Sequence, residues 1–222
     1  SPIKYAEGST LVRMGETHVL CAVTVDRGVP RWLRGQGKGW LTAEYALMPR
    51  STQRRTRRNH IKGGRAQEIR RLIGRSLRRA VNLDLLGEYT LIVDCDVMQA
   101  DGGTRTAAIN GGYVAVALAL NTMIENGTLP PGVLREPVGA VSVGILEDES
   151  RLDLAYAEDI ATEMDLNVVM DAADRFVEVQ GTAEGTPVDR AQLSALLDLA
   201  AEGIQGVIRN QREVLRCTGI EV

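Results

Sequence analysis

The chain has 222 residues, of which 44% are hydrophobic and 25% charged, and its formal net charge is −3. This length fits one large domain or two small ones, and the composition provides enough apolar side chains for a packed soluble core. No apolar run reaches the ~20 residues that span a membrane. Three cysteines without a C-x-x-C pair favour a reducing cytoplasm and disfavour a zinc site.

The first part of the chain predicts β-structure followed by one helix. Residues 9–14 and 17–25 are β-branched runs joined by a glycine turn, which is typical of a β-hairpin. Residues 39–48 form another extended segment. From residue 66 to 86, apolar side chains recur every three or four positions, which predicts an amphipathic helix.

Residues 50–64, between the extended segment and this helix, form a basic loop. The loop has no apolar periodicity and contains five arginines. A run of charge is usually a solvated connector. Arginine is also well suited to bidentate contacts with the phosphates of a nucleic acid. The sequence therefore leaves two interpretations open. The loop is either a solvated connector or a surface that contacts a polyanion or a protein partner.

The centre of the chain combines a strand, a polar turn and a helix. Residues 89–98 predict a mostly buried strand, and residues 106–124 predict a helix. The turn between them reads Asp101-Gly102-Gly103-Thr104-Arg105. Glycines at a helix N-terminus bring free N–H groups close to an anion, and a hydroxyl and a guanidinium add donors. The turn is thus a candidate phosphate site, although many strands connect to helices in this way without binding a ligand.

Arg65 stands out among the arginines of the predicted helix over residues 66–86. It lies at the N-terminal end, where the helix dipole disfavours a cation. This position calls for a compensating anion or a carboxylate partner. The other arginines of the helix are expected on its outer face.

The rest of the chain predicts further strands and a final helix. Residues 138–146 and 152–156 read as strands separated by an acidic turn, and residues 165–181 read as a second hairpin. Residues 190–215 predict a long amphipathic helix. The order of elements indicates an α+β fold of two similar halves, about 1–87 and 88–222.

Two pairs of aspartates are candidates for special roles. Asp159 and Asp165 flank a short segment between predicted strands, where they are either ordinary loop residues or a pair that binds a divalent cation or assists proton transfer. Asp94 and Asp96 share one face of a strand, where we expect an ion pair with a nearby arginine.

Histidine chemistry has little support in the sequence. Only His18 and His60 occur, and neither accompanies a nucleophile motif. Both are expected to have structural roles.

Several stretches together form a specific pattern. They are Gly35–Tyr45, Leu47–Thr52, Gly64-Arg65 leading into Glu68–Arg78, Asp94–Ala107, Asp165–Met170 and Val177–Gly185. Over nearly the whole chain this pattern closely resembles the bacterial ribonuclease PH family, and the segments from Gln99 to Arg105 and from Glu178 to Gly185 are its most specific parts. The resemblance implies a single ribonuclease PH-type domain over residues 1–222, with an α+β fold of two β-rich halves packed against helices.

The family resemblance also implies an activity. Its members are phosphate-dependent 3′→5′ exoribonucleases that trim the 3′ ends of transfer RNA precursors, with a further role in ribosomal RNA processing. Inorganic phosphate attacks the terminal phosphodiester and releases a nucleoside 5′-diphosphate, in a reversible nucleotidyl transfer. The resemblance further implies a cytoplasmic homohexamer, built as a trimer of dimers.

The resemblance assigns expected roles to particular residues. Phosphate would be held by Arg65, Gly103, Thr104 and Arg105. Asp159 and Asp165 would be the catalytic pair and would bind Mg²⁺. RNA contact or ring assembly would fall on Arg50, Arg55 and Arg58. The alternative is a weakly active or inactive RNA-binding ring subunit of an exosome-like assembly.

Overall fold

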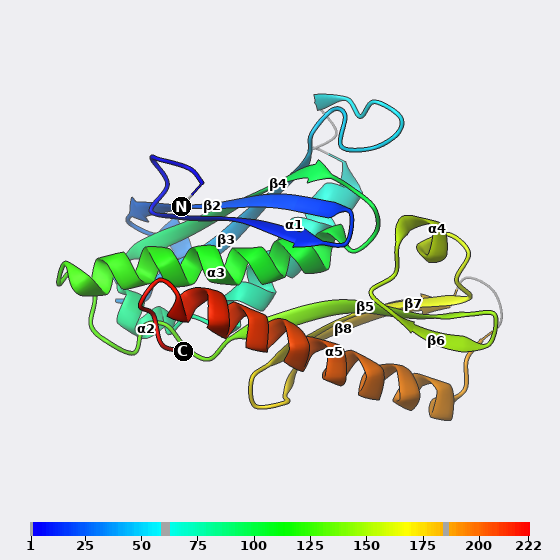
Figure 1. Ribbon diagram of the computed structural model, residues 1–222. Helices are drawn as coiled ribbons and strands as arrows, with labels where there is room; N and C mark the ends of the chain where they lie inside the picture. Colours follow the sequence, from blue (N-terminus) through cyan, green and yellow to red (C-terminus); the bar gives the residue numbers. More distant parts are fainter. Residues whose placement is uncertain (1, 59–62, 184–186) are drawn as a thin grey trace.

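The computed structural model describes residues 2–58, 63–183 and 187–222, and it contains two four-stranded sheets with helices between and beside them (Figure 1). In the first sheet, β1 and β2 form the predicted hairpin, and β4 pairs antiparallel with β2 and parallel with β3. In spatial order its strands are β1 (Gly8–Met14), β2 (Thr17–Arg27), β4 (Tyr89–Gln99) and β3 (Trp40–Leu47).

The position of β4 decides where the first sheet ends in the sequence. Because β4 lies between β2 and β3, the first sheet continues past the predicted boundary near residue 88 and ends at Gln99. A parallel pair needs a crossover connection. Helix α1 (Gly64–Arg79) provides it between β3 and β4, and the short turn of helix Arg31–Leu33 precedes β3.

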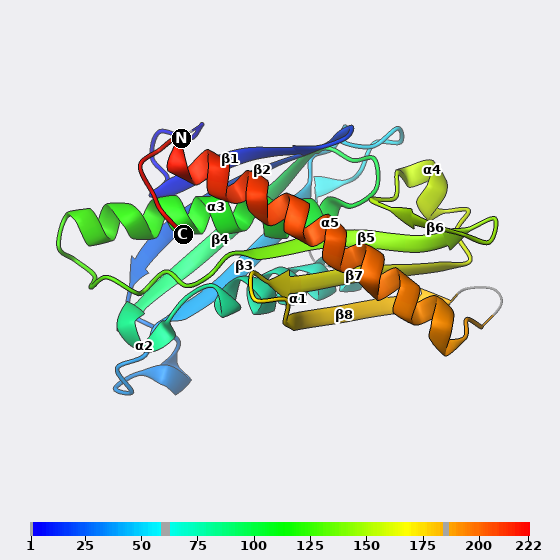
Figure 2. The ribbon, with the colours of Figure 1, turned by 60° about the horizontal axis from the view of Figure 1, so that its bottom comes forward.

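The second sheet is antiparallel throughout and contains the predicted hairpin of residues 165–181. Its strands, in spatial order, are β6 (Glu149–Leu152), β5 (Val138–Leu146), β7 (Met164–Asp171) and β8 (Phe176–Ala183). The amphipathic helix α5 (Arg190–Arg216) lies across one face of this sheet, as Figure 2 shows. The α+β architecture predicted from the sequence is confirmed.

Helix α3 (Thr104–Glu125) is the central element of the core. It packs against β1 and β2 of the first sheet, against β5 of the second and against α5 (Figure 1). Among the described residues it is the one helix long and apolar enough to cross a membrane, but 78% of its most apolar stretch is buried inside the protein. A helix that is apolar all round belongs in such a core.

Two elements differ from their predicted bounds by more than two residues. The helix expected over residues 66–86 ends at Arg79, and α2 (Leu83–Leu86) follows as a separate turn. The break arises because the backbone of residues 80–82 pairs with residues 133–135. The strand expected at residues 152–156 instead occupies Glu149–Leu152, because Asp153 takes a left-handed conformation and α4 (Tyr156–Asp159) begins shortly after it.

The expected ion pair at Asp94 and Asp96 is not formed among the described residues. Glu44, which lies opposite Asp94 on the adjacent strand β3, instead pairs with Arg70 of α1. Burial raises the pKa of both aspartates, and the negative charges of Asp96 and Glu44 raise that of Asp94 further. Of the two histidines, His18 lies in β2, and His60 lies outside the described residues.

Candidate active site

The glycine turn between β4 and α3 is shaped as the sequence predicted. Gly102 and Gly103 both have positive φ angles, of 77° and 54°, which residues other than glycine rarely adopt. The turn also packs tightly against the segment before α4, because a Cβ on Gly102 would lie 2.2 Å from the carbonyl oxygen of Leu154. The glycines therefore bring the start of α3 close to the second sheet.

A threonine on β2 fixes the turn from the other side. The Thr17 hydroxyl donates to the carbonyl oxygen of Gly102 at 2.6 Å and accepts from the backbone N–H of Asp101 at 2.8 Å. Thr17 is buried, and nothing in the local sequence pattern indicated this contact.

The start of α3 leaves hydrogen-bond donors open toward a cavity. No side chain caps α3 at Gly103. The first N–H groups of a helix have no partner within the helix, so they are available to an anion. The Thr104 hydroxyl lies among them, 2.8 Å from the hydroxyl of Tyr45 on β3.

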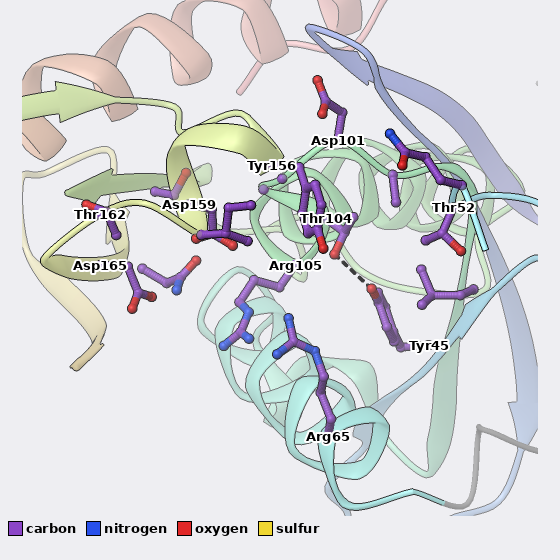
Figure 3. Close-up of a pocket in the computed structure, with 18 of the residues that line it drawn as sticks. Tyr45, Thr52, Arg65, Asp101, Thr104, Arg105, Tyr156, Asp159, Thr162 and Asp165 are labelled. Carbon is purple, nitrogen blue, oxygen red and sulfur yellow. Dashed lines mark hydrogen bonds between the residues drawn. The ribbon is translucent and has the colours of Figure 1, made fainter. Parts of the chain in front are cut away.

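Arg65 and Arg105 reach the same cavity from two different helices. Each lies in the first turn of its helix, α1 and α3 respectively, and Figure 3 shows both side chains below the turn that carries Thr104. The first turn of α1 contains no acidic residue, so the carboxylate partner that the sequence allowed for Arg65 is not found there. The cavity brings together the four predicted phosphate ligands, Arg65, Gly103, Thr104 and Arg105.

The hydroxyl of Tyr45 is buried next to the two guanidinium groups, and burial and positive charge shift its pKa in opposite directions. Burial raises the pKa of the Tyr45 hydroxyl, while the hydrogen bond with Thr104 and the charges of Arg65 and Arg105 lower it; burial prevails. Tyr45 is therefore a neutral hydroxyl at physiological pH, beside two guanidinium groups.

The two predicted catalytic aspartates line the opposite side of the cavity. Asp159 is the last residue of α4, and Asp165 is the second residue of β7 (Figure 3). Their elements belong to the second sheet and its connections, whereas the phosphate-side residues come from α1 and α3. The cavity has a volume of about 720 Å³ and is lined by both groups.

The aspartate pair suits a magnesium ion better than a closed metal site. In the described part of the chain, no three histidine, cysteine or acidic side chains are grouped closely enough to enclose a metal. Mg²⁺ does not need such a cage, because it is commonly held by one or two carboxylates, substrate phosphates and water. Asp159 and Asp165 fit this donor set.

The basic loop contacts the cavity through residues other than the predicted ones. Thr52, Gln53 and Arg54 line it, whereas Arg50, Arg55 and Arg58 are exposed and lie outside its lining. In Figure 1 the described residues 50–58 of this loop and α4 lie at the same end of the molecule, near the start of α3. Other lining residues that the sequence reasoning missed are Tyr45, Ser142, Tyr156, Ile160, Thr162 and Asn167.

Comparison with known sequences gives consistent matches over both parts of the chain. The model of the 3′ exoribonuclease family, domain 1, matches residues 1–120, and that of domain 2 matches residues 136–203. Ribonuclease PH of Moorella thermoacetica is 55% identical over 216 residues, which are 96% of this chain and 86% of that protein. Ribonuclease PH of Thermosynechococcus vestitus is 54% identical over 213 residues, which are 96% of this chain and 88% of that protein.

Solved structures share the fold at lower identity. The Archaeoglobus fulgidus exosome with RNA bound to the active site contains a chain with a TM-score of 0.79 and 21% identity, covering 94% of this chain and 84% of that one. Rice Rrp46 gives a TM-score of 0.73 at 23% identity, covering 94% of this chain and 90% of that one.

Proposed function

The chain belongs to the ribonuclease PH group of the 3′ exoribonuclease family, and from this premise we propose how its cavity performs phosphorolysis of RNA. The protein is a phosphorolytic 3′→5′ exoribonuclease. The observation that supports this assignment of the cavity is its division into two sides. Arg65, Thr104 and Arg105 offer donors and positive charge on one side, and Asp159 and Asp165 offer carboxylates on the other.

The cationic side binds the attacking inorganic phosphate. An oxygen of this phosphate forms a new bond to the phosphorus of the terminal phosphodiester, and the bond from that phosphorus to the 3′ oxygen of the preceding nucleotide breaks. The products are a nucleoside 5′-diphosphate and an RNA one nucleotide shorter, whose 3′ oxygen takes up a proton. Two anions must approach each other, so positioning and charge neutralisation supply most of the catalysis.

Asp159 and Asp165 would hold a magnesium ion through their carboxylate oxygens. When bound there, Mg²⁺ supplies positive charge that stabilises oxygens carrying negative charge in the transition state. The two carboxylates lie across the cavity from the arginines that would bind phosphate. Water that these carboxylates orient would supply the proton for the 3′ oxygen.

The RNA substrates include the 3′ ends of transfer RNA precursors, and ribosomal RNA precursors are a second class. Arg54 guides the RNA backbone into the cavity, and the exposed Arg50, Arg55 and Arg58 contact RNA or a neighbouring subunit. The protein assembles as a homohexamer, a trimer of dimers. An inactive ring subunit is less favoured, because all four phosphate-side residues and both aspartates line one cavity.

The reaction products test this proposal directly. The protein is incubated with a short single-stranded RNA and Mg²⁺, with and without inorganic phosphate, and the released nucleotides are separated by chromatography. We expect nucleoside diphosphates and shortening from the 3′ end only when phosphate is present. Nucleoside monophosphates, or equal shortening without phosphate, would contradict phosphorolysis.

A further inference from the structure

Arg105 is held on its far side by a short polar chain. Its Nη1 donates to Oε1 of Gln180 at 2.8 Å and lies 3.5 Å from Oε1 of Glu68. Nε2 of Gln180 donates to the same Oε1 of Glu68 at 2.9 Å. The amide of Gln180 thus uses its oxygen for the guanidinium and its nitrogen for the carboxylate, and each of the three side chains contacts both others.

The three side chains come from three separate elements. Glu68 lies one turn after Arg65 on α1, Arg105 lies in the first turn of α3, and Gln180 lies on β8 of the second sheet. The chain of contacts therefore connects the helix that carries Arg65 to the guanidinium of Arg105, and it connects both to the second sheet.

Glu68 and Gln180 do not line the cavity that holds the candidate phosphate site. They line a second cavity of about 300 Å³, between α1 and β8, together with residues such as Arg71 and Arg75. Arg105 lines the large cavity, and its side chain is only 15% exposed. Glu68 and Gln180 thus contact Arg105 on the side that faces away from the large cavity.

This arrangement has a physical consequence for anion binding. A free arginine side chain has many rotamers, and fixing them on binding costs affinity. The contacts of Nη1 fix the guanidinium beforehand and leave Nη2 and Nε available for a bidentate contact with phosphate. We propose that Glu68 and Gln180 are positioning residues that preorganise Arg105 for the attacking phosphate. This inference rests on the phosphate-binding role proposed above for Arg105.

The chemistry of the amide matters in this position. A leucine at residue 180 would remove both hydrogen bonds and free the guanidinium. A glutamate would be worse, because it cannot donate to Glu68 and would place a second carboxylate beside Arg105, which opposes an incoming anion. Substituting Glu68 by glutamine keeps an acceptor oxygen for Gln180 and removes only the charge. The expected order of harm is Gln180→Glu, then Gln180→Leu, then Glu68→Gln.

The same helix and strand offer a matched control. Glu178, two residues before Gln180 on β8, accepts from Arg75 of α1 with both carboxylate oxygens at 2.8 Å. This pair joins the same two elements but does not include Arg105. The variant Glu178→Gln therefore reports what a merely structural link between α1 and β8 contributes.

The test measures the KM for phosphate, the KM for RNA and kcat for each variant, with phosphate binding by calorimetry in the absence of RNA. For Gln180→Leu we expect phosphate KM and Kd to rise about tenfold, as for loss of preorganised hydrogen bonds. The KM for RNA and kcat at saturating phosphate should stay within about twofold of wild type. Glu178→Gln should leave the phosphate constants unchanged.

Two outcomes would overturn the positioning role. One is an unchanged phosphate Kd in both Gln180→Leu and Gln180→Glu, and the other is an equal rise in Glu178→Gln. Circular dichroism and thermal melting identify any variant that fails to fold, and Glu68→Gln then carries the comparison. If wild-type protein bound phosphate but released no nucleoside diphosphate, the proposed function would fail while calorimetry still decided the role of Gln180.

Discussion

The hydroxyl groups of Tyr45 and Thr104 lie 2.8 Å apart, although the two residues come from β3 and α3. Tyr45 is only 4% exposed, and burial holds its pKa above the ordinary value. The tyrosine stays protonated through the neutral range, so it can donate to the threonine oxygen and leave the threonine proton for phosphate. When Tyr45 is the donor of this hydrogen bond, the Thr104 hydroxyl can donate its own proton into the cavity.

Replacing Tyr45 by phenylalanine should weaken phosphate binding. We expect the KM for phosphate to rise about fivefold, which corresponds to the loss of one hydrogen bond of about 1 kcal/mol. The effect should not vary between pH 6 and 8, because Tyr45 does not titrate there. Steady-state kinetics at several phosphate concentrations measures it, with the exposed Tyr5→Phe as control. An equal KM for phosphate in Tyr45→Phe and wild type would contradict a role of Tyr45 in phosphate binding.

Arg105 should be essential for phosphorolysis but not for RNA binding. Arg105→Ala removes a guanidinium from the phosphate side, and we expect loss of more than about a hundredfold in kcat/KM, as for removal of a transition-state donor. RNA affinity measured by fluorescence anisotropy should change by less than about threefold. The control is Arg209→Ala, an exposed arginine on α5. Loss of RNA binding with normal turnover at saturating RNA would contradict this assignment.

The aspartate pair should govern the response to magnesium. Asp159→Asn and Asp165→Asn each remove one negative charge from the candidate cation site, so each should raise the Mg²⁺ concentration needed for half-maximal activity. A loss of about tenfold or more in kcat should accompany it. Titration of Mg²⁺ after chelation measures both effects, with the exposed Asp198→Asn as control. An unchanged Mg²⁺ requirement in both variants would rule out a metal at this pair.

The basic loop should divide into residues of two kinds. Arg54 lines the cavity, so Arg54→Ala should raise the KM for RNA in steady-state kinetics. The sedimentation coefficient of the assembly should not change. Arg58 is exposed outside the cavity, and Arg58→Ala should instead weaken RNA affinity or change the sedimentation coefficient of the assembly. Sedimentation velocity and RNA binding at two salt concentrations separate these effects. Arg58 has no role if neither quantity changes.

Local patterns in the sequence predicted the elements that carry the site. The run of β-branched and apolar residues over 89–98 predicted β4, and the helical spacing of apolar residues over 106–124 predicted α3. The glycine turn between them located the start of α3. The position of Arg65 against its helix dipole singled it out before the structure placed it near Thr104. These are effects within a few residues, which a single sequence expresses directly.

Contacts between distant segments could not be predicted in the same way. Gln180 meets Glu68 across 112 positions of sequence, and Thr17 holds the Gly102 carbonyl across 85. The helix after Arg65 ends early because residues 80–82 pair with a segment far along the chain. Helix α4 was missed because one turn of helix has almost no periodicity of its own. Tertiary contacts decide the two hydrogen bonds and the end of α1, whereas the length of α4 decides that it escapes prediction.

Asp171 joins α1 to the second sheet through a buried carboxylate. It is 1% exposed and accepts from Nη2 of Arg79 on α1 at 2.8 Å and from Nε of Arg175 at 2.9 Å. Burial raises the pKa of Asp171, but hydrogen bonds from the Arg175 side chain and from the backbone of Arg175 and Ala173 outweigh it. The pKa therefore lies below its usual value.

Asp171→Asn should destabilise the protein in a pH-dependent way. At pH 7 we expect the free energy of unfolding to fall by about 2 kcal/mol, because the buried carboxylate loses its charge-assisted hydrogen bonds from Arg79 and Arg175, whose side chains are 33% and 59% exposed. Because the folded-state pKa of Asp171 is lowered, its stabilisation is complete above the unfolded pKa of about 3.9 and is lost as the pH falls through the folded value. The difference between wild type and variant should therefore shrink below about pH 4, as urea titrations from pH 7 to pH 3 can measure. Asp84→Asn is the control, since the Asp84–Lys38 pair is 65% and 53% exposed and should contribute less than about 1 kcal/mol. A difference at Asp171 that stayed constant with pH would show that its charge does not carry the link between α1 and the second sheet.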